Sequence, residues 1–100
     1  MSRSAAEAVR FLKVVAHERR LMILCHLCCG EKSVGELTGC VGTPQATTSQ
    51  MLAVLREQGL VNARRDGQRV FYSLVSGDAR DLIGLLYKLN CGNQQSTADL

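Results

Sequence analysis

The change of hydrophobic period at Gly59 constrains the fold of this 100-residue chain more than any other feature. Before Gly59, apolar residues recur at the 3.6-residue spacing of amphipathic helices. After it, residues 60–65 and 68–74 alternate with the period of two that is typical of β-strands. Asp66 and Gly67 stand between these two runs as a two-residue turn signal. The sequence therefore predicts a set of helices followed by one β-hairpin.

Two helices joined by a tight turn precede this hairpin. A capping-box pattern at residues 33–36 opens a short helix. A second helix is expected over Thr43–Gly59, with Thr43 as its N-cap and Pro44 at its first helical position. The short connection through Gly42 gives the sequence form of a helix-turn-helix. Together with the hairpin, it predicts a mainly α fold with a β-hairpin wing, a winged helix-turn-helix.

Three further helices are expected, at residues 4–16, 18–29 and 78–90. The middle one is almost continuously apolar and is predicted to be a buried central helix. The first and last carry more apolar surface, around Phe11 and Leu86, than one small core can cover. Pairing these two helices across a two-fold axis would bury both surplus faces, so we expect a homodimer.

The chain length predicts one winged-helix DNA-binding and dimerisation domain at residues 1–92, followed by a disordered polar tail at residues 93–100. No apolar run approaches the roughly 20 residues of a membrane span, and the N-terminus lacks a signal-peptide pattern. We therefore expect a cytoplasmic protein without a membrane partner. In a reducing compartment, five cysteines indicate core residues, metal ligands or redox thiols rather than a disulfide framework.

Polar residues at the start of the Thr43–Gly59 helix suit the recognition of base edges. Glutamine matches the donor and acceptor that adenine presents in the major groove, and threonine can bond several bases. On this helix we expect Ser49 and Leu52 to share one side, while Met51 points away from it. The alternative is an ordinary solvated helix face. The predicted contacts to base edges are Gln45, Thr47, Ser49 and Gln50.

Three arginines surround the hairpin turn, with a single acidic residue among them. Arg64, Arg65 and Arg69 against Asp66 leave this region net positive, where a wing would lie along a phosphate backbone. Arginines can also protect an exposed strand from aggregation. Their position beside a helix-turn-helix favours contact with double-stranded DNA.

The chain resembles the ArsR/SmtB family of small dimeric winged-helix repressors from about Ala5 to Cys91. The resemblance implies a homodimer built on the first and last helices, two recognition helices spaced for successive major grooves, and release of operator DNA when an inducer binds. Thr48 and Met51 depart from the aliphatic residue and the histidine that many members carry. The matching segments are HERRLMIL at 17–24, SVGEL at 33–37, SQMLAVLREQGLV at 49–61 and RRDGQRVFYSL at 64–74.

Two cysteines resemble the inducer site of one branch of this family. The C-x-C motif of the metal sensors is absent, and the last helix has no histidine. Cys25 within LMILC and Cys91 within LLYKLNC resemble instead the pair of the sulfide- and persulfide-responsive branch, the BigR, SqrR and HlyU type. The resemblance implies that reactive sulfur species link these two thiols and that the repressor then leaves DNA.

Other interpretations of the cysteines stay open. Cys25 is also explained as a small apolar core residue. Thiolates of Cys25, Cys28, Cys29 or Cys91 could bind a soft metal or arsenite, whereas Cys40 has no evident partner. The chain lacks a Gly-rich phosphate loop and a paired acid and base, so neither an enzyme nor a cofactor is expected. An interaction module that does not bind DNA is the remaining rival.

Overall fold

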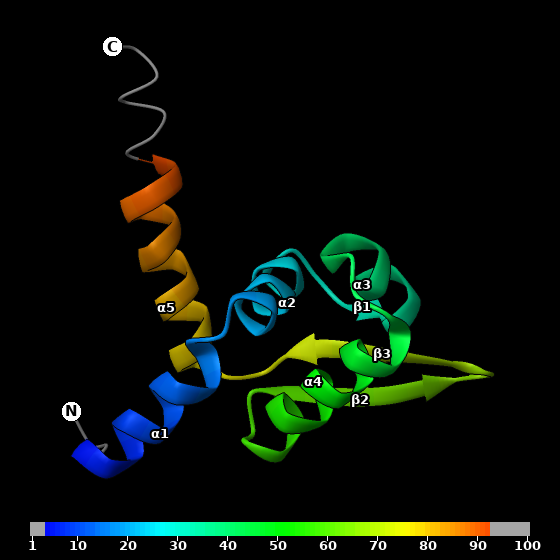
Figure 1. The fold of residues 1–100 in the computed structure, drawn as a ribbon, viewed down its shortest axis with the longest axis horizontal. Coiled ribbons are helices and arrows are strands. Elements are labelled where there is room, and N and C mark those ends of the chain that lie inside the picture. Colours follow the sequence, from blue (N-terminus) through cyan, green and yellow to red (C-terminus); the bar gives the residue numbers. More distant parts are fainter. Residues whose placement is uncertain (1–3, 93–100) are drawn as a thin grey trace.

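The structure is a computed structural model that describes residues 4–92 of the chain, with side chains as far as Asn90. It is mainly helical and carries a small antiparallel sheet, which confirms the winged helix-turn-helix (Figure 1). No helix within the described residues is long and apolar enough to cross a membrane. The predicted tail, residues 93–100, lies outside the described residues. The elements are α1 (Ala5–Val15), α2 (Glu18–Cys28), β1 (Lys32–Ser33), α3 (Val34–Val41), α4 (Gln45–Glu57), β2 (Val61–Asp66), β3 (Arg69–Leu74), α5 (Gly77–Tyr87) and the π-helical turn η1 (Lys88–Gly92).

The sheet contains one strand more than the predicted hairpin. Its order is β1-β3-β2, with both pairings antiparallel. The two residues of β1 are too few to show a period of two, so no local pattern indicates this strand. Asp66 pairs with Arg69, so the turn residues are Gly67 and Gln68, one position later than predicted. Gly67 has φ 65°, which suits the first central position of a tight hairpin turn.

Side-chain caps mark the starts of most of the described helices, including the capping box predicted at residues 33–36. Ser4 and Ser33 each form a complete capping box. His17 caps α2 by accepting a hydrogen bond from the backbone N–H of Arg20. Ser76 caps α5, which therefore begins at Gly77 instead of one residue later.

The start of α4 is the exception. Pro44 occupies the N-cap position, no side chain caps the helix, and the first helical residue is Gln45. The prediction that Thr43 is the N-cap was therefore wrong. Thr43 is buried, and its hydroxyl shares a 2.6 Å hydrogen bond with the hydroxyl of Thr48, which is fully buried one turn into α4. The two threonines thus hold the turn between α3 and α4 against the recognition helix.

This hydroxyl pair gives a first prediction. Thr48→Val should lower the free energy of unfolding by about 1–3 kcal/mol, because it leaves a buried hydroxyl without its partner. Replacing Thr43 and Thr48 together by valine should restore much of that loss, since both polar groups are then removed. Urea unfolding of the wild type and the variants measures this. A double variant that loses the sum of the two single losses would show that the hydroxyls are not coupled.

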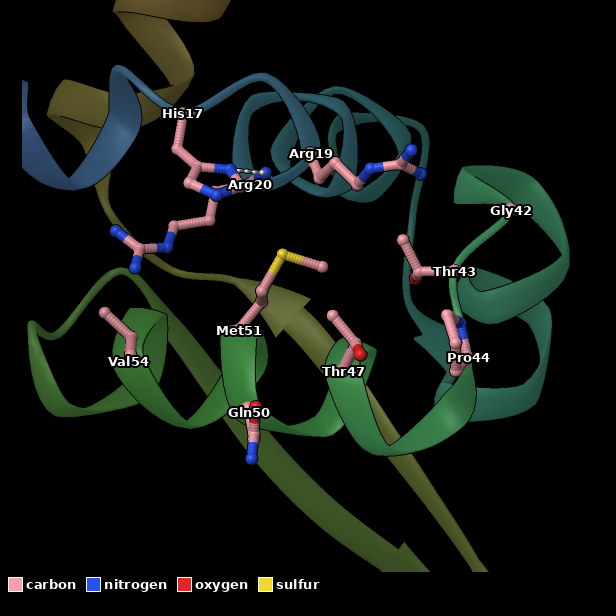
Figure 2. Close-up of a pocket in the computed structure, with 10 residues that line it drawn as sticks. All are labelled: His17, Arg19, Arg20, Gly42, Thr43, Pro44, Thr47, Gln50, Met51 and Val54. Atoms are coloured by element: carbon pink, nitrogen blue, oxygen red, sulfur yellow. Dashed lines mark hydrogen bonds between the residues drawn. The ribbon is translucent and has the colours of Figure 1, made fainter.

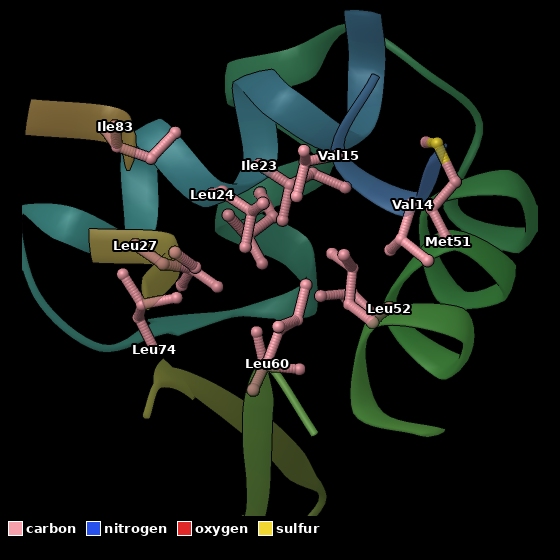
Figure 3. Packing of buried hydrophobic residues seen from close by; sticks show 14 of the residues in the cluster. Val14, Val15, Ile23, Leu24, Leu27, Met51, Leu52, Leu60, Leu74 and Ile83 are labelled. Atoms are coloured by element: carbon pink, nitrogen blue, oxygen red, sulfur yellow. The ribbon is translucent and has the colours of Figure 1, made fainter. Parts of the chain in front are cut away.

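All five α-helices and the sheet contribute buried residues to the hydrophobic core of the described chain (Figure 3). Leu52 and Leu55 face it, but Met51 is only 6% exposed, so the prediction that Met51 points away from the side of Leu52 was wrong. Ser49 is exposed, so it does not share the buried side of Leu52. Positions 48, 51, 52 and 55 follow the ordinary i, i+3, i+4, i+7 stripe of a half-buried helix. Figure 3 shows Met51 beside Val14 of α1.

Two helices keep large apolar surfaces exposed. Helices α1 and α5 lie together at one side of the molecule, away from α3 and the tip of the wing (Figure 1). Leu12 on α1 is 49% exposed, Leu85 on α5 is 51% exposed, and Leu89 in η1, which continues α5, is 52% exposed. Phe11 and Leu86, around which these faces were predicted, are only partly exposed, and Phe11 packs against the core. A monomer of the described residues therefore leaves other apolar side chains of both helices uncovered.

Candidate nucleic-acid interface

The turn between α3 and α4 sets the position of the recognition helix. Gly42 ends α3 in the left-handed conformation at φ 76°, and its N–H donates to the carbonyl of Thr38 at 2.9 Å. A residue with a side chain is strained at such a φ, which explains the glycine here. Helix α4 begins three residues later. The four residues predicted to contact bases are all exposed on it: Gln45, Thr47, Ser49 and Gln50.

These four residues face two different grooves, one on each side of α4. The wing-side groove, of about 640 Å³, lies between α4, the start of α3 and the wing. The α2-side groove, of about 610 Å³, lies between α4 and the start of α2 (Figure 2). Gln45 and Ser49 line the first, whereas Thr47 and Gln50 line the second. Helix α4 is therefore a ridge between two grooves, and the major groove of DNA is wide enough to admit such a helix.

The arginines of the wing differ in their surroundings. Arg64 donates two hydrogen bonds to Glu31, from Nε to Oε2 at 2.8 Å and from NH2 to Oε1 at 2.7 Å. This bond lowers the pKa of the Glu31 carboxyl and raises the pKa of Arg64. Arg69 donates to the hydroxyl of Ser33 at 3.2 Å. The guanidinium carbons of Arg64 and Arg69 both lie 4.8 Å from the centre of the Phe71 ring.

Arg65 is exposed and, one residue along β2, points to the opposite face of the strand from Arg64. The sequence did not indicate Glu31 as a partner of Arg64. The two residues are 33 positions apart, and only the fold brings the end of α2 to the base of the wing. The phosphate contact predicted for Arg64 must therefore compete with an existing carboxylate.

A second prediction follows from this competition. Glu31→Gln should raise the affinity for duplex DNA by about 3–10-fold, and each added phosphate contact should steepen the slope of log affinity against log salt by about 0.9. The ion pair is exposed and therefore weak, so we expect its removal to raise the affinity by no more than this. The lowered pKa keeps Glu31 ionised at neutral pH, and the pair is lost only as the pH falls through that pKa. Fluorescence anisotropy over a salt series measures the change.

Asp66→Asn provides the matched control for this prediction. Asp66 lies 3.9 Å from Arg64, so its charge is close but it does not replace the paired geometry of Glu31. Asp66→Asn should therefore change the slope of log affinity against log salt less than Glu31→Gln does. Identical affinities and slopes for the wild type and Glu31→Gln would show that Glu31 does not hold Arg64 away from phosphate.

Cys25 lies on the exposed side of α2, so its interpretation as a buried core residue was wrong. Ile23, Leu24 and Leu27 occupy the buried side of the helix. Helix α2 packs against α5, and the backbone of Cys91 lies in η1, which continues α5. The side chain of Cys91 lies outside the described residues. The fold therefore packs α2 against the helix that leads into η1, and the distance between the two thiols stays a prediction.

The remaining cysteines have distinct environments. Cys28 is partly buried, and the pKa of its thiol is raised, mainly by desolvation and against the opposing charge of Arg80. A raised pKa leaves less thiolate at neutral pH, so this thiol is a weaker nucleophile and metal ligand. Cys29 and Cys40 are exposed. Among the described side chains, no group of three His, Cys, Asp or Glu residues could hold a metal ion, so the cysteines of α2 do not converge by themselves.

A mainly helical chain that presents an exposed polar helix between a basic wing and a second groove belongs to the class of winged-helix DNA-binding regulators. The sequence pattern of the family described as "Bacterial regulatory protein, arsR family" matches residues 17–63. The chain belongs to this family, and it is a transcriptional regulator, not an enzyme.

Several relatives cover nearly the whole chain. The transcriptional activator HlyU from Vibrio cholerae serotype O1 is 47% identical over 95% of this chain and 88% of its own length. The crystal structure of the transcriptional repressor BigR from Xylella fastidiosa superposes with a TM-score of 0.83 at 45% identity, covering 87% of this chain and 89% of that one. The solution structure of the homodimeric winged helix-turn-helix domain of Mb0332 from Mycobacterium bovis matches at TM-score 0.73 and 30% identity, over 95% and 94% of the two chains.

Proposed function

We propose that this chain is a homodimeric repressor that binds operator DNA through α4 and the wing, and leaves it when reactive sulfur species bridge Cys25 and Cys91. The exposure of Cys25 on a helix that packs against α5 is the observation that carries this proposal. Residues 1–92 would act as one DNA-binding and dimerisation domain in the cytoplasm. A thiol at the surface can ionise and meet a small reactive molecule, whereas a core cysteine cannot.

The likeness to known regulators supports the dimer and the direction of control. The Mb0332 domain is homodimeric, and the exposed apolar faces of α1 and α5 supply a surface for the same arrangement here. BigR is a transcriptional repressor, whereas HlyU is a transcriptional activator. We favour repression because the proposed bridge weakens DNA binding. Release of a repressor from its operator then permits transcription as soon as the inducer is present.

The proposed chemistry balances without a metal or cofactor. A persulfide transfers its outer sulfur atom to a cysteine thiolate and leaves as a thiol. Condensation of two such persulfidated cysteines releases hydrogen sulfide and forms a trisulfide. A direct disulfide requires Cα atoms within about 7 Å, so a pair set further apart would accept a longer sulfur chain while resisting peroxide. That geometry would make the switch selective for reactive sulfur.

The soft-metal alternative has weaker support. It needs thiolates at Cys25, Cys28, Cys29 or Cys91, but burial raises the pKa of Cys28 and disfavours its thiolate. The described side chains bring no three such ligands together. The sulfur switch requires only two thiols, of which one is exposed.

A third prediction tests the contact to bases. Gln45 is exposed at the start of α4, so Gln45→Ala should cost about 1–3 kcal/mol on the operator and much less on random DNA. Arg65→Ala, the control, should weaken both complexes alike because phosphate contacts carry no sequence information. Anisotropy titrations on an operator obtained by in vitro selection measure both variants. Equal losses of Gln45→Ala on the two DNAs would place the reading face elsewhere.

A further inference from the structure

The α2-side groove is the more basic of the two grooves that flank α4. Arg19, Arg20 and His17 line it, and no acidic residue does. The wing-side groove pairs the charge of Arg69 with that of Glu36. The positive charge beside the recognition helix is therefore concentrated on the side away from the wing.

Both arginines of this groove are held in place and keep unused donors. Arg19 donates from Nη1 to the carbonyl of Val41 at 3.1 Å, and Arg20 donates from Nη1 to the carbonyl of Val14 at 3.3 Å. Each guanidinium has five N–H donors, so one such bond leaves most of them available. The Nε of Arg20 is buried and has no hydrogen-bond partner among the described residues. Figure 2 shows the Arg20 side chain reaching toward Val54, while that of Arg19 extends toward the opposite end of α4.

The N-terminus of α4 adds to the same field. This 13-residue helix has no side-chain cap, so its first N–H groups lack the usual acceptor. Pro44 and Thr47, from this first turn, line the α2-side groove together with the two arginines. Uncapped N–H groups and the positive end of a helix dipole favour an anion, and a phosphate oxygen suits them.

We propose that the α2-side groove binds a backbone phosphate of DNA, through Arg19 and Arg20. A helix in the major groove has one phosphate strand on each side. The wing would hold one strand, and the α2-side groove holds the other. This inference rests on the proposed binding of DNA by α4, and it assigns to the start of α2 a phosphate contact that fixes how α4 enters the groove.

The test uses the full chain and a labelled duplex of arbitrary sequence, because phosphate contacts do not depend on sequence. Arg19→Gln and Arg20→Gln should each reduce the slope of log affinity against log salt by about 0.9 per lost contact, or about 1.8 for a dimer. The deficit relative to the wild type should then widen about tenfold as salt falls from about 200 to 50 mM. Lys13→Gln, on the exposed surface of α1, removes the same charge and should leave the slope unchanged.

Further variants separate this contact from a purely structural role. Arg19→Lys keeps the charge and should retain the wild-type slope. Thermal unfolding of Arg19→Gln shows whether loss of the hydrogen bond to the Val41 carbonyl lowers the stability of the fold. Slopes equal to the wild type in both glutamine variants, with or without a lower Tm, would overturn the inference. If Arg19→Gln and Lys13→Gln reduce the slope equally, net charge explains the effect and the groove is not a site. A wild-type protein that fails to bind the duplex at about 50 mM salt would instead overturn the proposed function.

Discussion

Leu12→Asp should convert the protein from a dimer to a monomer and lower its operator affinity by roughly 10²–10⁴-fold. The expected loss equals the gain in affinity that a dimer obtains by binding two linked half-sites instead of one. Leu12 is half exposed on α1, and Leu85 is similarly exposed on α5. In the proposed dimer both side chains are buried, and an unpaired carboxylate is costly in such an apolar contact. Light scattering under reducing conditions gives the mass, and anisotropy gives the affinity.

Two further variants support this interpretation. Leu85→Asp should reproduce the effect from the other helix. Val75→Asp changes a residue that is also 50% exposed but lies between β3 and α5, and it should stay dimeric. A Leu12→Asp protein that keeps the dimer mass, or a wild type that is already monomeric at micromolar concentration, would contradict the proposed dimer.

Cys25→Ser and Cys91→Ser should each bind operator like the reduced wild type and yet fail to respond to persulfide. A bridge between α2 and α5 ties the core to the dimer-forming helix, and it should alter the spacing of the two α4 helices. A change of only about 1.4 kcal/mol between the two states is already tenfold in affinity. We therefore expect persulfide treatment to lower the operator affinity of the wild type at least about tenfold. Intact mass should show added sulfur and lost hydrogen in the wild type and no bridge in either variant.

The other cysteines serve as matched controls. Cys28→Ser should still respond, because burial raises the pKa of that thiol and lowers its reactivity. Cys29→Ser and Cys40→Ser remove exposed thiols, so a normal response would show that exposure alone does not make the switch. A lost response in any of these three variants would assign the sensing thiol to a different residue.

The sequence predicted the fold well because its signals are local. The capping box at Ser33 and the period change at Gly59 each depend on neighbouring residues, and the structure places a helix or strand boundary at or near each. Errors arose where a tertiary contact overrides the local preference. Thr43 turns inward to bond Thr48 and does not cap α4, because the turn packs against the helix.

The candidate site was predictable only in part. The polar residues of α4 and the wing arginines were predicted from local sequence patterns, and the structure places all of them on the surface. The partner of Arg64 and the basic groove at Arg19 and Arg20 depend on which helix ends meet, and no spacing in the sequence reveals that. The charged start of α2 lies beside α4 only in the folded chain.

The most direct test of the proposed switch titrates a persulfide donor into the complexes of operator DNA with the wild type and with Cys91→Ser. Fluorescence anisotropy measures whether each protein releases the DNA. The wild type should release the duplex, and a reductant should restore binding, whereas Cys91→Ser should stay bound throughout the titration. Release of DNA by Cys91→Ser would contradict the proposed switch. So would a wild type that resists persulfide but dissociates with stoichiometric zinc or arsenite.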